Sequence, residues 1–447
     1  MRTAGTEFNV HGSLTQDGKD AMTQIEQPSA ANAGPIPDAA STKKWRIVGP
    51  GLVAAATGVG SGDLVATLIA GQKYGYALLW ACVAGTIMKI VLVEGVGRYT
   101  LATGNTIFHG WTQLGKWTQW YFAPYIVIWG FVYGAAAMSA TGMALHALIP
   151  AVPLVAWAVV TGLIGFALNW AGQYKVFEKI IAVLVGIMFL TVCVIACFSL
   201  SNIGEIITGL VPSVPEGSFV YVLSLAGGVG GTITLAAYGY WLHEKGWDSV
   251  PWMRVMRLDN SVAYTVTGIF VIAMLIIGGD LLYSAGIAVD SGDQGLVQLA
   301  DVLEARYGSV MSVVFLVGFW AAALSSVLGV WNGVSMMFAD YVGHLKKLPK
   351  DHPDIQMGGK YYRWFILWLT FPPMLLLFLG KPTALVIAYG VLGAFFMPFL
   401  GLTLLLLLNT KHTPKQWRNG WFVNTLMAII SIAFIFICGN ELVGVFS

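Results

Sequence analysis

The chain has 447 residues, of which 57% are hydrophobic and only 10% are charged. A soluble domain carries about 25% charged residues, so this composition excludes a water-soluble fold. The net charge of +2 is too small to indicate a nucleic-acid partner. Composition and charge therefore predict an all-α integral membrane protein whose surroundings are the lipid bilayer.

The first 42 residues differ from the rest of the chain. They are rich in Ala, Gly, Ser, Thr, Pro and Gln and show no periodicity, which predicts a disordered tail over 1–42. No positively charged region followed by an apolar run occurs there, so no cleaved signal peptide is expected. Residues 43–447 are predicted to form one transmembrane domain.

Eleven apolar segments follow, each close to the 20 or so residues that a helix needs to cross a bilayer. The predicted spans are approximately 46–72, 75–101, 120–148, 152–171, 177–200, 219–243, 261–285, 310–340, 364–380, 383–408 and 421–440. The ninth contains Pro372 and Pro373, which we expect to bend or break it.

Lysine and arginine in the connecting loops predict the orientation. With a cytoplasmic N-terminus, the inside segments include the clusters 43–46, 346–350 and 411–418, whereas the outside segments carry only Lys73, Arg306 and Lys381. Basic residues are enriched on the cytoplasmic side of membrane proteins. We therefore expect a multi-pass protein of the plasma (inner) membrane, with its N-terminus inside and its C-terminus outside.

Two of the apolar segments are interrupted by glycines. The first contains Thr57-Gly58-Val59-Gly60-Ser61-Gly62-Asp63, and the second contains Gly227-Gly228-Val229-Gly230-Gly231 and then Ala236-Ala237-Tyr238-Gly239. Glycine disfavours helix, and a matched pair of broken spans indicates a substrate site in an inverted-repeat transporter. We expect residues 58–62 and part of 230–239 to be non-helical and close together.

The parity of the spans makes the second repeat inverted relative to the first. The sequence thus predicts a LeuT-like 5+5 inverted repeat, with repeat one at about 46–200, repeat two at about 219–408 and an extra helix at about 421–440. The four cysteines lie in apolar runs and are interpreted as core residues. No nucleotide-binding loop or catalytic motif is present, so we predict neither an enzyme nor a cofactor.

Several short motifs, in a shared order, resemble the Nramp family of proton-coupled divalent-metal transporters over most of residues 45–440. They are Gly49-Pro50-Gly51, Tyr74-Gly75-Tyr76-Ala77-Leu78-Leu79-Trp80, Leu101-Ala102-Thr103-Gly104, Phe177-Glu178-Lys179-Ile180, Leu242-His243, Ser325-Ser326 and Pro398-Phe399. This resemblance implies the LeuT-like fold and the transport of a divalent cation.

The metal-binding motifs of that family are altered here. Its Asp-Pro-Gly-Asn motif falls on Gly60-Ser61-Gly62-Asp63, its Met-Pro-His-Asn motif falls on Ala236-Ala237-Tyr238-Gly239, and a family glutamine falls near Tyr389 or Gly390. A thioether helps to select transition metals, and its loss puts selectivity for Mn²⁺ or Fe²⁺ in doubt. A hard carboxylate with backbone carbonyls suits an ion such as Mg²⁺.

The candidate substrate-binding residues are Asp63, Gly60, Tyr238, Ala236 and Tyr389, with Asp63 as the metal ligand. An ionisable group within a span is costly and is usually functional, although Asp63 also suits the N-cap of the second half-helix. His243, Glu244 and Glu94 are weaker candidates for a proton relay. Lys89 and Glu94 are not spaced as a helix-face pair, so Glu94 is expected to pair with Arg98, and Asp259 is interpreted as an interfacial charge.

The leading hypothesis is a secondary transporter that moves a divalent cation by alternating access, and proton coupling is left open. One alternative keeps the fold but carries a small organic solute, whose carboxylate or amine meets a half-helix end or Asp63. A second alternative is a sensor or interaction protein that does not transport. The sequence leaves the substrate, the coupling ion and the oligomeric state open.

Overall fold

The computed structural model describes residues 49–59, 61–223, 225–226, 231–283 and 295–446. The tail predicted over 1–42 lies outside these residues. All regular structure in the described part of the chain is helical, which confirms the all-α prediction.

The helices follow one another with short connections. The helices of the first half are α2 (Pro50–Gly58), α3 (Ser61–Tyr74), α4 (Leu79–Thr103), α5 (Ile107–Leu114), α6 (Lys116–Leu148), α7 (Leu154–Trp170), α8 (Tyr174–Phe198) and α9 (Ile203–Thr208). Those of the second half are α10 (Phe219–Leu223), α11 (Thr234–Glu244), α12 (Met253–Gly278), α13 (Gly295–Tyr307), α14 (Ser309–Lys346), α15 (Lys360–Leu377), α16 (Pro382–Asn409) and α17 (Trp421–Phe446). Single turns lie at Val250–Trp252, Pro353–Ile355 and Lys415–Trp417, and a π-helical segment, Gly279–Tyr283, extends α12.

Each predicted span coincides with one helix or with a pair of short helices. Six helical stretches in the described residues are long and apolar enough to cross a membrane, namely Leu79–Thr103, Lys116–Leu148, Tyr174–Phe198, Val250–Tyr283, Ser309–Lys346 and Ala384–Asn409. Shorter apolar helices lie at Leu154–Trp170 and Trp421–Phe436. The total of eleven spans stays a prediction. α15 continues through Pro372 and Pro373 as one helix, so the prolines do not break it.

Local sequence signals explain several helix ends. Pro50 is the first residue of α2, where its missing N–H costs nothing. Thr106 caps α5 and accepts a hydrogen bond from the His109 N–H at 3.2 Å. Gly104 ends α4 in the left-handed conformation, with φ 64°.

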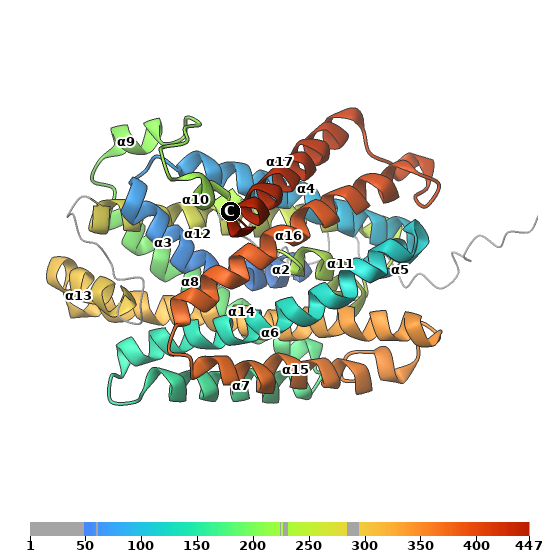
Figure 1. Cartoon of the computed structure of the whole chain (residues 1–447), viewed down its shortest axis with the longest axis horizontal. Helices are drawn as coiled ribbons and strands as arrows, with labels where there is room; N and C mark the ends of the chain where they lie inside the picture. Colours follow the sequence, from blue (N-terminus) through green and yellow to red (C-terminus); the bar gives the residue numbers. More distant parts are fainter. Residues whose placement is uncertain (1–48, 60, 224, 227–230, 284–294, 447) are drawn as a thin grey trace, which may run out of the picture. The chain divides into compact units, whose positions relative to one another are not determined.

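The two short helices α2 and α11 lie at the centre of the bundle (Figure 1). They pack against each other and against α14, while α12 packs on α2, α3 and α4. α6 packs on α7, α14, α15 and α16, and α17 packs on α16 and α4. Longer helices thus surround the two short ones on several sides, which holds both broken segments in place.

Candidate functional site at the broken helices

The first predicted break lies where its glycines are. α2 ends at Gly58, Val59 leaves the helical conformation with φ −82° and ψ 69°, and α3 begins at Ser61. Gly60 lies outside the described residues. The break is shorter than the predicted 58–62, because Gly58 still belongs to α2 and Gly62 already belongs to α3.

The second break precedes α11. α10 ends at Leu223, and residues 231–233 are described and belong to no helix. Gly231 has φ +92°, in the left-handed region that residues with a side chain rarely adopt. The expected non-helical stretch is therefore confirmed for 231–233. Ala236 and Tyr238, in contrast, lie within α11.

The end of α2, at Gly58, meets the second break at Gly231. A Cβ atom placed on Gly231 would lie only 3.1 Å from the Cα of Gly58 and 2.5 Å from the Thr234 Oγ1. Together with its positive φ, this lack of space allows only glycine at position 231. The prediction that the broken segments come close together is confirmed.

Two hydroxyl groups of α14 face the carbonyls at the end of α2. The Oγ of Ser325 lies 3.3 Å from the Ala56 carbonyl oxygen, and the Oγ of Ser326 donates to the Thr57 carbonyl at 2.9 Å. Tyr133 of α6 places its hydroxyl 2.6 Å from the Ser326 Oγ. The last carbonyls of a helix lack partners within that helix, and here a neighbouring helix supplies them. The first break is therefore lined by oxygen atoms.

A lysine that the sequence analysis did not assign to the site reaches the second break. Lys89 lies near the middle of α4, and it is only 1% exposed. Its Nζ donates to the Gly231 carbonyl at 2.6 Å and lies 3.4 Å from the Sδ of Met397 on α16. A charge in the middle of a span costs at least about 2.5–3.5 kcal/mol, which makes such residues functional candidates. In the sequence, the signal that could have identified Lys89 is a lysine within an apolar run.

α16 contributes a glycine and a tyrosine to this region, and the glycine faces Thr232 of the second break. Thr232 is 2% exposed, and its Oγ1 has no hydrogen-bond partner among the described residues. Gly393 makes room for it, since a Cβ on Gly393 would lie 2.8 Å from the Thr232 Cγ2. The predicted site residue Tyr389 is buried, with its ring 4.9 Å from that of Tyr133. Tyr389 is therefore linked to the first break through Tyr133.

Tyr238 has a partner that corrects one interpretation. Its hydroxyl donates to the Asp259 Oδ2 at 3.0 Å, and the same carboxylate accepts the N–H groups of Gly49 at 2.9 Å and Gly51 at 2.6 Å. Asp259 is fully buried, so the expectation of an interfacial charge is wrong. A Cβ on Gly51 would lie 2.7 Å from the Asp259 Oδ2, so glycine permits this approach. Asp259 of α12 thus caps the N-terminus of α2, the half-helix that leads to the first break.

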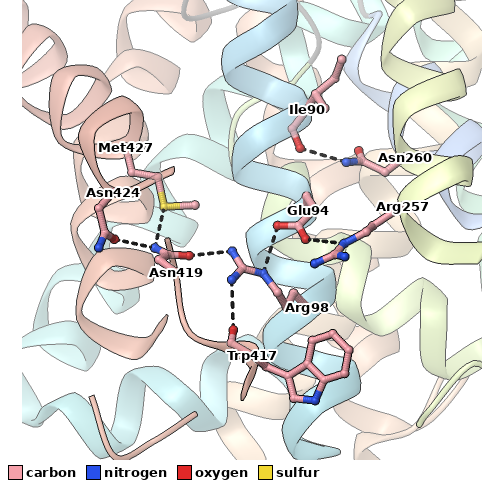
Figure 2. Close-up of polar contacts among 9 residues, drawn as sticks. All are labelled: Ile90, Glu94, Arg98, Arg257, Asn260, Trp417, Asn419, Asn424 and Met427. Carbon is pink, nitrogen blue, oxygen red and sulfur yellow. Dashed lines mark hydrogen bonds and ion pairs between the residues drawn. The ribbon is translucent and has the colours of Figure 1, made fainter. Parts of the chain in front are cut away.

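Glu94 takes part in a network of ion pairs (Figure 2). The expected pair with Arg98 forms at 3.1 Å, and Arg257 of α12 lies 2.9 Å from the other carboxylate oxygen. Arg98 also donates to the Trp417 carbonyl at 3.0 Å and to the Asn419 Oδ1 at 2.6 Å. This network joins α4 and α12 to the connection that precedes α17. Two arginines hold the Glu94 carboxylate, which favours a structural role over a proton relay.

His243 and Glu244 lie at the far end of α11 from the break. They line a cavity of about 220 Å³ together with His109, Asp340, His344 and Lys350. The His109 Nδ1 lies 3.2 Å from the His344 Nε2, and Asp340 accepts hydrogen bonds from Thr106 and Tyr240. Burial, with added repulsion from Lys350 and His344, lowers the pKa of His109 on α5. This cluster is titratable and lies apart from the breaks.

Asp63 lies in the first turn of α3, which begins at Ser61, so the alternative that it is the N-cap of this half-helix is wrong. Its side chain lies outside the described residues, as does Gly60. Ala236 is fully buried in α11 and presents only a methyl group. Among the side chains that the structure describes, no three His, Cys, Asp or Glu residues are grouped to hold a metal ion. The described oxygen donors at the breaks are carbonyl and hydroxyl groups.

The sequence model of the natural resistance-associated macrophage protein-like family matches residues 51–444. The divalent metal cation transporter MntH of Bacillus subtilis is 22% identical over 411 residues, which cover 87% of this chain and 89% of the relative. That of Mycobacterium leprae is 24% identical over 424 residues, covering 88% and 92%.

Solved structures show the same fold. The Eremococcus coleocola manganese transporter, in complex with an aromatic bis-isothiourea substituted compound, superposes with a TM-score of 0.73 at 16% identity, covering 90% of this chain and 88% of that chain. MhsT in complex with L-phenylalanine gives a TM-score of 0.62 at 16% identity, covering 87% and 97%. The second likeness bears out the LeuT-like architecture.

Proposed function

The chain belongs to the Nramp family of multi-pass membrane transporters, and from this premise we propose that it moves a divalent metal cation across the membrane by alternating access. At the level of the family, it is a transporter and not an enzyme. The observation that carries the proposal is the meeting of the two helix breaks at Gly58 and Gly231. Broken helices free backbone carbonyls, which bind cations in transporters of this architecture.

Asp63 is the proposed charged ligand. It lies in the first turn of the helix that follows the first break, and a carboxylate is a hard oxygen donor. Hard divalent cations that keep part of their water shell suit carboxylate and carbonyl oxygens. The methyl group of Ala236 supplies no sulfur, and the thioether of Met397 already contacts the Lys89 ammonium. These features favour selectivity like that for Mg²⁺ over a strong preference for Mn²⁺.

The proposal includes a cytoplasmic N-terminus and coupling to protons. In this orientation the cavity that holds His243 and Glu244 lies toward the cytoplasm, where both residues could exchange protons with water. Glu94 is excluded from the proposed relay because Arg98 and Arg257 hold its carboxylate.

One observation favours the alternative of a small organic solute. Lys89 presents an ammonium group at the second break, and an ammonium group is a natural partner for a carboxylate. The fold accommodates such solutes, since MhsT was solved with L-phenylalanine. The two candidates differ in whether the site needs a negative charge from Asp63 or a positive charge from Lys89.

Flux into proteoliposomes distinguishes them. Wild-type protein should take up Mg²⁺ or Mn²⁺, and Asp63→Ala should abolish this uptake without loss of folded protein. Asp63→Asn keeps the size and one side-chain oxygen of the residue but lacks its charge. Asp63→Asn should therefore also lose transport. Normal cation flux in Asp63→Asn, at unchanged thermal stability, would reject the binding role.

A further inference from the structure

We propose that Lys89 sets the cation affinity of the site, because its ammonium group occupies the Gly231 carbonyl as a built-in competitor for the transported cation. By competing for this oxygen, Lys89 keeps cation binding weak and cation release fast. This inference rests on the proposed function and adds an affinity-determining residue from α4, outside the two broken segments.

The contact at Gly231 carries the first step. Gly231 lies in the break, and its N–H and carbonyl belong to no helix. The carbonyl oxygen receives the Lys89 Nζ at 2.6 Å, a short charge-assisted hydrogen bond. A carbonyl of an unwound span is the type of oxygen that coordinates a cation in such transporters. Lys89 therefore occupies a position where a cation would bind.

The position of Gly231 carries the second step. Gly231 packs against Gly58, the last residue of α2, so the carbonyl that Lys89 contacts belongs to a residue that touches the end of the first half-helix. Thr232, the next residue, is 2% exposed, and its hydroxyl has no hydrogen-bond partner among the described residues. A buried hydroxyl without a partner is costly unless a ligand or water uses it. This hydroxyl is a further oxygen donor beside the one that Lys89 covers.

Charge carries the third step. An ammonium group and a divalent cation that contact the same carbonyl oxygen lie only a few ångströms apart and repel each other strongly. Cation binding therefore requires Lys89 to withdraw from Gly231. Removing the charge should tighten cation binding by about 100-fold, well short of the full Coulomb repulsion at short range. A site that binds more tightly also releases more slowly, so turnover should fall.

A purely structural role for Lys89 predicts the opposite pattern. The lysine also contacts Met397 on α16, so it bridges α4, the second break and α16. If this bridge only held the helices together, loss of the hydrogen bond would weaken folding and substrate binding together. The changes in KM and kcat therefore distinguish the two roles, because a competing charge predicts a lower KM when the charge is removed and a structural role predicts a higher KM.

The test uses full-length protein in proteoliposomes, with Mg²⁺ and Mn²⁺ as substrates. Lys89→Gln removes the charge and keeps hydrogen-bond donors, and Lys89→Met keeps an apolar chain of similar length. Lys89→Arg keeps the charge, and Lys411→Gln removes an exposed lysine in the connection between α16 and α17 as the matched control. We expect Lys89→Gln and Lys89→Met to lower KM by about 100-fold and to lower kcat, since both remove the competing charge. Lys89→Arg should retain a high KM.

Three results would overturn the inference. An unchanged or raised KM in folded Lys89→Gln and Lys89→Met shows that the charge does not compete with the cation. A drop in KM in Lys89→Arg equal to that in Lys89→Gln shows that size, and not charge, matters. Uptake of a carboxylate solute that Lys89→Gln abolishes and Lys89→Arg preserves assigns Lys89 to the organic-solute alternative. Failure of the wild type to take up either cation refutes the proposed function itself, and that result is visible before any variant is made.

Discussion

Replacing Asp259 tests whether one buried carboxylate anchors the first half-helix. This carboxylate accepts three hydrogen bonds, from the Gly49 N–H, the Gly51 N–H and the Tyr238 hydroxyl. In Asp259→Ala the two backbone N–H groups lose this acceptor, and the Tyr238 hydroxyl keeps only the Met256 carbonyl at 3.3 Å. Each buried donor left without a partner costs about 1–3 kcal/mol. The variant no longer buries a carboxylate charge, and this gain offsets part of the total cost. We therefore expect Asp259→Ala to destabilise the protein by about 3–5 kcal/mol, which is the summed cost of the donors that lose this acceptor less that offset.

Two milder variants should lose less stability than Asp259→Ala and serve as a comparison. Asp259→Asn can keep its oxygen on the side of Gly51 and Tyr238, which leaves only the Gly49 N–H facing an amide nitrogen. Its expected cost is about 1–3 kcal/mol. Tyr238→Phe removes one donor and keeps the ring, at about 1 kcal/mol.

Thermal unfolding of the purified protein in detergent should rank these variants. The expected order of loss is Asp259→Ala, then Asp259→Asn, then Tyr238→Phe. Equal stability of Asp259→Ala and Tyr238→Phe would refute the reasoning, because the backbone N–H groups of α2 would then not depend on the carboxylate.

Three further predictions follow from other contacts. Gly231→Ala should abolish transport and lower thermal stability, because its Cβ would lie 3.1 Å from the Gly58 Cα. The control Gly186→Ala on α8, whose Cβ would have no atom within 4 Å, should leave transport and stability unchanged. Equal behaviour of the two variants would contradict the packing of Gly231 against Gly58. Arg98→Ala should lower the free energy of unfolding by about 3 kcal/mol, since Arg98 loses three partners. It should also expose the connection before α17 to limited proteolysis, and an unchanged digestion pattern would count against the anchoring role of Arg98. Because Ala236 lacks sulfur, excess Mg²⁺ should inhibit Mn²⁺ uptake; micromolar Mn²⁺ transport that Mg²⁺ leaves untouched would show a soft ligand elsewhere.

Features that depend on local sequence could be predicted from it. The apolar segments correspond to helices because each must satisfy its own backbone hydrogen bonds within a bilayer. The breaks were located because glycine disfavours helix wherever it occurs. The pair between Glu94 and Arg98 was expected because residues four apart share a helix face.

Contacts between helices could not be predicted in this way. Asp259 appeared to be a surface charge because it lies near the start of its span, and only the packing of α12 on α2 brings it to Gly49 and Gly51. Lys89 was visible as a charge in an apolar run, but Gly231, whose carbonyl it contacts, lies 142 residues further along the chain. The spacing of residues along one helix does not determine which face meets which neighbour.

The sequence by itself therefore determined the membrane class, the positions of the two breaks and, through the resemblance of its motifs, the family. The tertiary structure decided which groups meet at the breaks, namely the serines of α14 at the end of α2 and Lys89 of α4 at Gly231. The physical reason is that backbone preferences and hydrophobicity act over a few residues. The rotation and depth of each helix, in contrast, are set by close packing against several neighbours at once.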